Sequence, residues 1–191
     1  MKKTTLIFTI VGISILFFCS AFLNDNNTDL CKSFINSLNE RKTDEAAKFC
    51  NDSLKVKFNY SNSIKKKVDF FNYLKNRANL KSQIIIDSSI IITNKIVIYS
   101  KNTNSFNQYL KLHSLPLKYS FSVVENLITE INIDSLKGYN DSLRINDKRW
   151  LYFEKWSASK HEGLNLYYVK LQYPDSLLTL AKEFYQSAVK K

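Results

Sequence analysis

Two alternating runs of apolar and polar residues, which meet at Glu125-Asn126, constrain the fold of this chain more than any other feature. The apolar residues on one side of the alternation are Phe121, Val123, Leu127, Ile131 and Ile133. Alternation with a period of two is typical of half-buried strands. We therefore predict a β-hairpin over residues 119–134, whose apolar side is the surface on which neighbouring helices can bury their own apolar faces.

Three more segments are predicted as strands. Residues 82–93 are rich in isoleucine and are interrupted around Asp87, which indicates one long bent strand or two strands separated by a bulge. Residues 95–100 alternate in the same way, and residues 106–113 form the third segment. Short turns join these segments, so the sheet is predicted to be antiparallel. Glycine is rare, so left-handed turn positions are expected at asparagines such as Asn94.

Helical spacing of apolar residues flanks the predicted sheet on both sides. Before the sheet we predict an amphipathic first helix, a short helix over residues 43–50, and a third helix that opens near residues 61–63. The third helix is expected to bury Ile64, Val68, Phe71, Leu74 and Ala78. After the sheet, Asp147 is predicted to cap one helix and Pro174 to open the last. The result is an α+β fold: an antiparallel sheet packed against N-terminal helices, with a helical tail over residues 147–191.

The chain has 191 residues, enough for one domain with its own core, which we place at residues 29–191. The formal net charge of +11 favours encounters with anionic surfaces without specifying a partner. The densest basic run, Lys65-Lys66-Lys67, is expected on the solvated side of the third helix. The sequence has no RNA-binding aromatic signature, Cys/His finger or basic zipper, which argues against nucleic acid as a partner.

Residues 1–23 have the order of a bacterial export signal, basic and then apolar, and a polar tether follows at residues 24–28. Three fates are open. Cys19 resembles the lipidated cysteine of a lipoprotein signal, although Phe18 departs from the small residue expected before it. Residues 19–21 can serve as a cleavage site, or the run can remain as a membrane anchor, for which about 18–20 residues are needed. The expected location is extracytoplasmic, in the cell envelope, with attachment to the membrane through the N-terminal segment.

Two stretches carry a resemblance to a known superfamily. Residues 34–46, FINSLNERKTDEA, resemble the opening helix, polar turn and small second helix of nuclear-transport-factor-2-like proteins, which include ketosteroid isomerases and SnoaL-like polyketide cyclases. Residues 121–131, FSVVENLITEI, resemble the last hairpin of that superfamily, with Asn126 at a turn position that is often glycine. The resemblance covers about residues 29–133. It implies a curved sheet wrapped around helices to form a cone whose mouth can hold a small ligand.

The residues able to do chemistry are scattered. The sequence has no metal-ligand spacing, phosphate loop or nucleophile elbow, and no cofactor is predicted. The resemblance implies that an isomerase or cyclase would use a carboxylate or histidine on the concave face of the sheet, for which Asp87 and His113 are the candidates. Tyr99, Tyr109 and Tyr119 are the candidate ligand-binding residues.

Two classes of function stay open. The first, which the scattered candidates favour, is a non-catalytic binding or interaction domain, with a small apolar ligand or an anionic envelope component as its partner. The second is a small-molecule isomerase or cyclase. An enzyme of that type needs a base held in a dry pocket with a tuned pKa, and no such constellation stands out in the sequence.

Two further patterns concern the cysteines and the tail. Cys31 and Cys50 lie on either side of a predicted helical turn, and an oxidising compartment favours a disulfide between them, so we predict that they pair. Trp150, Phe153 and Trp156 form one face of the predicted tail helix. Such a stripe usually packs, here over an open side of the cone. The other interpretation is a partner-facing or membrane-facing patch, since aromatic residues flanked by Lys and Arg suit lipid interfaces.

Overall fold

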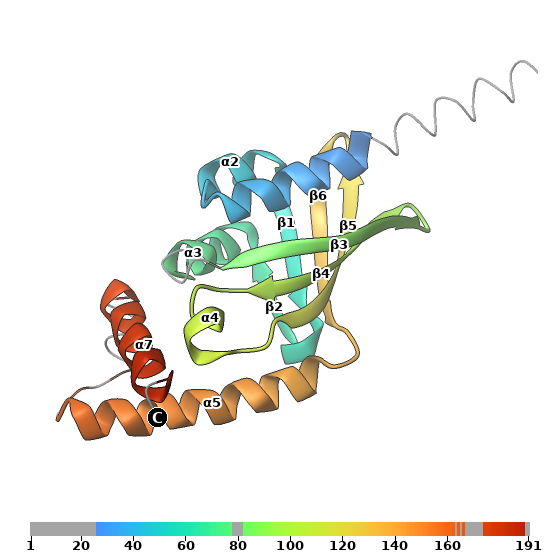
Figure 1. Ribbon diagram of the computed structural model, residues 1–191. Coiled ribbons are helices and arrows are strands. Elements are labelled where there is room, and N and C mark those ends of the chain that lie inside the picture. The colour runs from blue at the N-terminus through green and yellow to red at the C-terminus, as the bar shows by residue number, and fades with distance from the viewer. Residues whose placement is uncertain (1–25, 78–81, 163, 165, 167–173, 190–191) are drawn as a thin grey trace, which may run out of the picture.

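The computed structural model describes residues 26–77, 82–162, 164, 166 and 174–189 (Figure 1). It has an α+β fold built on a six-stranded sheet that does not close into a barrel. In chain order the strands are β1 (Cys50–Phe58), β2 (Ser63–Lys66), β3 (Gln83–Ile92), β4 (Lys95–Thr103), β5 (Leu115–Val124) and β6 (Leu127–Ser135). Their order across the sheet is β2-β1-β6-β5-β4-β3.

The sheet is mixed, which corrects the expectation of a wholly antiparallel one. Strands β1 and β6 are parallel, and the other neighbouring pairs are antiparallel. Parallel neighbours need a long connection. Here the connection from β1 to β6 contains most of the remaining sheet, so this pairing leaves no local signal in the sequence.

Helices lie at two places around the sheet. A helix over residues 26–39, α2 (Thr43–Lys48) and α3 (Lys67–Arg77) pack against one face, and the 3-10 turn η1 (Asn59–Ser61) joins β1 to β2. The C-terminal helices are α5 (Tyr139–Lys160) and α7 (Pro174–Val189), and the short helix α4 (Asn107–Leu110), between β4 and β5, packs with them. Figure 1 shows α5 as a long rod below the sheet, with α7 beside it.

The first helix begins inside the predicted tether, because residues 26–28 are already helical. The predicted export segment, including Cys19, lies outside the described residues.

The predicted hairpin is confirmed as β5 and β6. Glu125 and Asn126 have φ values of 51° and 59°, as in the two-residue turns whose twist matches that of the flanking strands. The phase of β6 differs from the prediction, because Ile128 is buried and Leu127 is only partly buried. A register shift beside Ser122 makes Thr129 an extra residue in β6 and moves the alternation by one position.

Strand β3 is a single strand with a bulge, which is one of the two predicted alternatives. The register against β4 shifts between Ile86 and Ser88, so Asp87 marks the bulge. The turn into β4 has left-handed backbone at Thr93 and Asn94, with φ values of 47° and 60°. The expectation for Asn94 is confirmed.

The helix predicted to open near residues 61–63 is wrong in its first turn, because Ser63–Lys66 form β2, and β1 lies over Cys50–Phe58, where the sequence analysis assigned no element after Cys50. In β1 the buried residues Leu54, Val56 and Phe58 recur at every second position. That period was present in the sequence, but the sequence analysis did not assign it to a strand, and the predicted second helix ran two residues past the end of α2. Pairing with both β2 and β6 decides for strand, since it satisfies the backbone on both sides of β1.

Helix α3 starts later than predicted and buries only part of the predicted face: Phe71 is buried and Leu74 is partly buried, and Ala78 lies outside the described residues. It begins at Lys67 and buries Phe70 and Phe71, whereas Ile64 and Val68 are exposed. Phe70 contacts Phe58 of β1, and Phe71 contacts Phe70. The packing of α3 on β1 therefore sets which side of this helix is buried.

Two predictions for the second half of the chain are also wrong. Residues 106–113 form the short helix α4 and a turn instead of a strand, because Phe106 and Leu110, four apart, both pack against the C-terminal helices. Helix α5 begins at Tyr139 rather than at Asp147, after Gly138 with a left-handed φ of 88°. The last helix opens at Pro174 as predicted.

The C-terminal helices have an apolar core of their own, which we call the tail cluster. Its buried members are Phe106, Leu110, Phe153, Leu166, Leu177 and Ala181. Trp150 and Trp156 pack against it, with edge contacts to Phe106 and Phe184 respectively. The predicted aromatic face of the tail helix is therefore a packing face, directed at α4 and α7 rather than at an open side of the sheet.

Candidate ligand-binding cavity

The interior of the cone contains two adjoining chambers. The inner chamber has a volume of about 160 Å³ and the outer chamber about 480 Å³. The residues that line both are Phe58, Tyr60, Tyr73, Ser82, Asn102 and Leu117. The inner chamber extends toward Leu38 of the first helix and Ile84 of β3, and the outer chamber extends to Tyr139 and Asn146 of α5.

The inner chamber has mainly apolar walls. Its apolar lining, besides the shared residues, is Leu38, Phe70, Leu74, Ile84 and Ile133. One wall is fixed by Asn39, whose Nδ2 donates to the Ile84 carbonyl at 3.0 Å while its Oδ1 accepts from the Ile84 N–H at 2.7 Å. Because β3 is an edge strand, Asn39 satisfies backbone groups there that have no neighbouring strand on that side.

A phenol and an amide form the buried polar pair of the inner chamber. Asn102 Nδ2 donates to the Tyr119 hydroxyl oxygen at 2.9 Å. That hydroxyl can also donate to Asn102 Oδ1, which lies 3.3 Å away. Tyr119 is 6% exposed. Burial raises the pKa of Tyr119 to about 12, and the hydrogen bond with Asn102 opposes the shift. The phenol therefore stays protonated at neutral pH and can act as a donor or an acceptor to a bound molecule.

The outer chamber is polar, and its ionisable side chains include Lys65 and His113. Lys65 pairs with the fully buried Val56 across the β1–β2 ladder, so its side chain starts on the core side of the sheet. Its Nζ lies 5.1 Å from the centre of the Tyr73 ring. Among the described residues, no Asp or Glu lines either chamber.

The mouth of the outer chamber is tied to α5 at His113. The His113 N–H donates to Asn146 Oδ1 at 2.7 Å, and Asn146 Nδ2 donates to the His113 carbonyl at 2.9 Å. Tyr139 also contacts Tyr60, with ring centres 5.4 Å apart. Helix α5 therefore forms part of the chamber wall as well as part of the tail.

The candidate site residues predicted from the sequence lie at different places in the structure. Tyr119 lines the inner chamber and His113 the outer one. Asp87 lies at the bulge of β3 and pairs with Lys101 at 3.3 Å, outside both chambers. Tyr99 alternates with the buried Ile98 and Ser100, so it points to the opposite face of the sheet.

Tyr109 belongs to a different place, a hollow of about 250 Å³ on the outside of the tail cluster. This tail hollow is lined by Tyr109, Leu110, Lys111, Arg149, Tyr152, Phe184, Tyr185 and Ala188. Lys111 Nζ lies 5.9 Å from the Tyr185 ring centre, and Lys182 Nζ lies 5.7 Å from the Tyr109 ring centre. The described lining combines basic and aromatic groups and contains no carboxylate.

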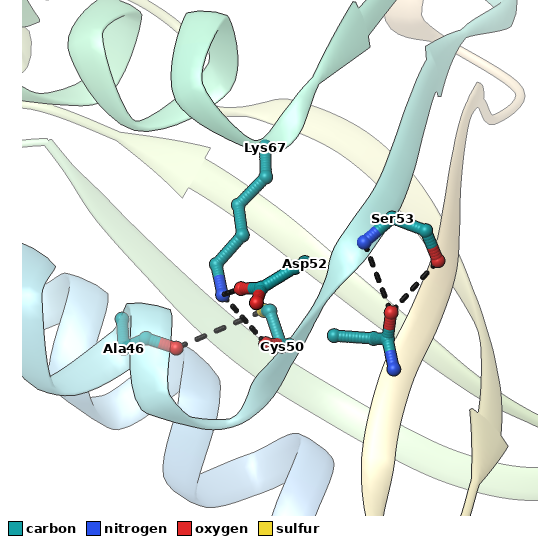
Figure 2. A network of polar contacts seen from close by, with 6 residues as sticks. Ala46, Cys50, Asp52, Ser53 and Lys67 are labelled. Carbon is teal, nitrogen blue, oxygen red and sulfur yellow. Dashed lines mark hydrogen bonds and ion pairs between the residues drawn. The ribbon is translucent and has the colours of Figure 1, made fainter.

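The disulfide predicted between Cys31 and Cys50 is not formed, and both cysteines are free and buried. The Cys50 thiol is directed at the Ala46 carbonyl, with Sγ 3.7 Å from the oxygen. Lys67 Nζ donates to the Cys50 carbonyl and to Asp52, both at 2.8 Å (Figure 2). Burial raises the pKa of each thiol to about 12. These cysteines therefore act as small apolar core residues.

Three cavity residues were missed by the sequence analysis: Asn39, Lys65 and Asn102. Asn102 continues the inward phase of Ile98 and Ser100, so the alternation of β4 contained a signal for it. Lys65 was assigned to a solvated helix face because β2 was predicted as helix. Asn39 had no signal, since its role depends on where the first residues of β3 lie in space.

The described residues contain neither a candidate metal site nor a candidate membrane-spanning helix. No group of three or more His, Cys, Asp or Glu side chains is placed to hold a metal ion there. Within the same ranges, no helix combines the length and the apolar character needed to cross a bilayer. The apolar run at residues 6–23 lies outside those ranges.

No family model matches the sequence, and no curated protein matches it significantly. Solved structures do match the fold. A candidate ketosteroid isomerase from Kribbella flavida has a TM-score of 0.52 at 12% identity, over 60% of this chain and 81% of that one. A candidate SnoaL-like polyketide cyclase from Shewanella putrefaciens also has a TM-score of 0.52, at 11% identity, over 62% of this chain and 86% of that one.

A nuclear-transport-factor-2-like protein of unknown function from Cytophaga hutchinsonii matches 58% of this chain and 89% of its own, with a TM-score of 0.48 and 13% identity. Identities this low concern the fold and not the activity. The fold resemblance expected from residues 34–46 and 121–131 is confirmed by the matches with the higher TM-scores. The chain has the nuclear-transport-factor-2-like fold.

Proposed function

We propose that this protein is a non-catalytic binding module that holds a small, largely apolar ligand inside the cone. The observation that carries the proposal is the inner chamber, an apolar space with one buried phenol–amide pair. Small-molecule sites are commonly concave and apolar, with a few polar groups that orient the ligand. A volume of about 160 Å³ resembles the roughly 150 Å³ apolar cavity known to bind benzene, so one ring or a short chain fits.

The alternative is a small-molecule isomerase or cyclase of the ketosteroid-isomerase type. Such a reaction needs a base within hydrogen-bond reach of the bound molecule. The described lining of the two chambers supplies no carboxylate, Asp87 lies outside, and His113 belongs to the outer chamber. Binding without turnover is therefore the better supported function.

Blocking the inner chamber tests the binding function. In Ile84→Trp the larger side chain fills the chamber, whereas in the control Ile90→Trp the same change is made on the same strand at an exposed position outside both chambers. Single-ring compounds would be screened by ligand-observed NMR. We expect hits that bind the wild type and Ile90→Trp but not Ile84→Trp. The absence of hits, equal binding to both variants, or chemical conversion of a bound compound would contradict the proposal.

We further propose that residues 1–23 export the chain and attach it to the membrane at the cell envelope. The basic, apolar and polar order of the N-terminal residues supports this location. Fractionation of cells that express the full chain and Cys19→Ala separates the three fates. A lipoprotein loses its membrane attachment on the change, an anchored chain keeps it, and a cleaved chain is released in both cases. Unprocessed protein in the cytosol would contradict export.

The tail hollow supports contact with an anionic component of the envelope. Arg149 lines the tail hollow together with tyrosine side chains. Arg144, on the same helix, does not line it and serves as the control, and its Nη2 lies 3.6 Å from Asp141 Oδ1. Co-sedimentation with anionic vesicles is expected to fall for Arg149→Glu and to change much less for Arg144→Glu. Equal loss in both variants would indicate only the general basic charge of the chain.

A further inference from the structure

We propose that the ligand of the cone is an amphiphilic acid, with its ring or short chain in the inner chamber and its carboxylate beside Lys65 in the outer chamber. This inference rests on the proposed binding function and adds the chemical class of the ligand. It depends on the charges that face the cavity, on the side of the sheet from which Lys65 starts, and on the way the two chambers adjoin.

Among the described residues, the formally charged side chains that line the cavity are both basic. Lys65 lines the outer chamber, and Arg41 lines the inner one from an exposed turn. The described linings contain no Asp or Glu to neutralise them. A neutral ligand would leave this charge uncompensated, whereas an acid supplies the missing partner.

Lys65 differs in its surroundings from lysines nearby in the sheet. Lys57 pairs with Glu130, and Lys67 pairs with Asp52. For Lys65 the described residues provide a cation–π contact with Tyr73 and no carboxylate within ion-pair distance. Its ammonium group thus keeps hydrogen-bond donors available on the cavity side.

The junction between the chambers gives the ligand its orientation. Tyr73 lines both chambers and lies under the Lys65 ammonium, so a carboxylate at Lys65 sits next to the entrance of the inner chamber. From there an apolar group can enter the space that ends at Tyr119. An arylalkanoic acid has this shape, with one ring and a short linker to the carboxylate.

The test compares acids with their neutral amides. The full-length chain, reconstituted in nanodiscs of neutral lipid, is titrated calorimetrically with phenylacetate, 3-phenylpropionate and 4-phenylbutyrate, and with the primary amide of each. We expect at least one acid to bind about tenfold more tightly than its amide, as a charge-assisted hydrogen bond predicts. Lys65→Gln should remove this preference and leave the affinity for the amide unchanged within about twofold.

Lys66→Gln is the matched control, because Lys66 is the next residue of β2 and is exposed. It should keep the full preference, and Lys65→Arg should keep most of it. Thermal melting checks that each variant is folded. If acid and amide bind the wild type equally, the inference is wrong while the binding function stands. The inference would also be wrong if Arg41→Gln, and not Lys65→Gln, removed the preference for the acid. Failure of every compound to bind would overturn both proposals.

Discussion

The side chains of Asn102 and Tyr119 meet across the β4–β5 pair, with the amide nitrogen 2.9 Å from the phenol oxygen. Both line the inner chamber, so the contact that stabilises the wall is also the polar group offered to a ligand. A buried polar pair of this kind costs stability when one partner is removed, because the other is left unsatisfied.

Tyr119→Phe is predicted to lower the free energy of unfolding by about 1 kcal/mol at neutral pH. The pKa of Tyr119 is raised to about 12 in the folded protein, so folding favours the protonated phenol. Its contribution is fully present below the ordinary tyrosine pKa of about 10 and is lost as the pH rises through the folded value. In urea unfolding, the wild type should therefore lose more stability than Tyr119→Phe as the pH rises from about 10 to about 12. Tyr99→Phe, on the other face of the sheet, is the control, and equal pH profiles for all three proteins would contradict the prediction.

Asn39→Ala is predicted to destabilise the fold by about 1–3 kcal/mol, because the N–H and carbonyl of Ile84 lose their partners. Hydrogen exchange should also show faster exchange of the Ile84 amide. Asn36→Ala on the exposed side of the same helix should change neither quantity. Equal exchange of the Ile84 amide in the wild type and Asn39→Ala would show that the side chain does not hold β3.

The two buried thiols are predicted to be free and slow to react. In a chain with Cys19→Ser, a thiol reagent should modify Cys31 and Cys50 slowly in the native state and both of them rapidly after denaturation. The reason is burial, which raises the pKa of both thiols to about 12 and so leaves little thiolate at neutral pH. Recovery of fewer than two reactive thiols after denaturation without reductant would contradict this prediction and support a disulfide between Cys31 and Cys50.

Glu130→Gln is predicted to weaken the acid dependence of stability. Lys57 hydrogen-bonds Glu130 and, with Lys95, holds the pKa of that carboxyl below its ordinary value, against the effect of burial. A lowered pKa stabilises the fold above the ordinary value, and this contribution is lost as the pH falls through the folded value. The variant should be less stable than the wild type at pH 7 and should approach it in acid. Glu125→Gln at the exposed hairpin turn serves as control, and a constant difference between Glu130→Gln and wild type would contradict the assignment.

Several parts of the fold depend on local period and turn chemistry and could be predicted from the residues alone. The hairpin around Glu125-Asn126 follows from two alternating runs and a turn that asparagine tolerates at positive φ. The bulge at Asp87 and the start of the last helix at Pro174 are local in the same sense. The short stretch at residues 34–46 and the hairpin together were sufficient to indicate the superfamily fold.

The identity of β1 and β2, and with it the place of Lys65, depends on contacts between distant parts of the chain. The period of two in Leu54, Val56 and Phe58 is short, and β1 becomes a strand by pairing with β2 and with β6, which is distant in the chain. The same holds for the cavity, since Asn102 and Tyr119 meet only after β4 and β5 pair. Local period measures which side of an element can be buried, whereas the choice of partner depends on contacts between residues far apart in sequence, which no short window contains.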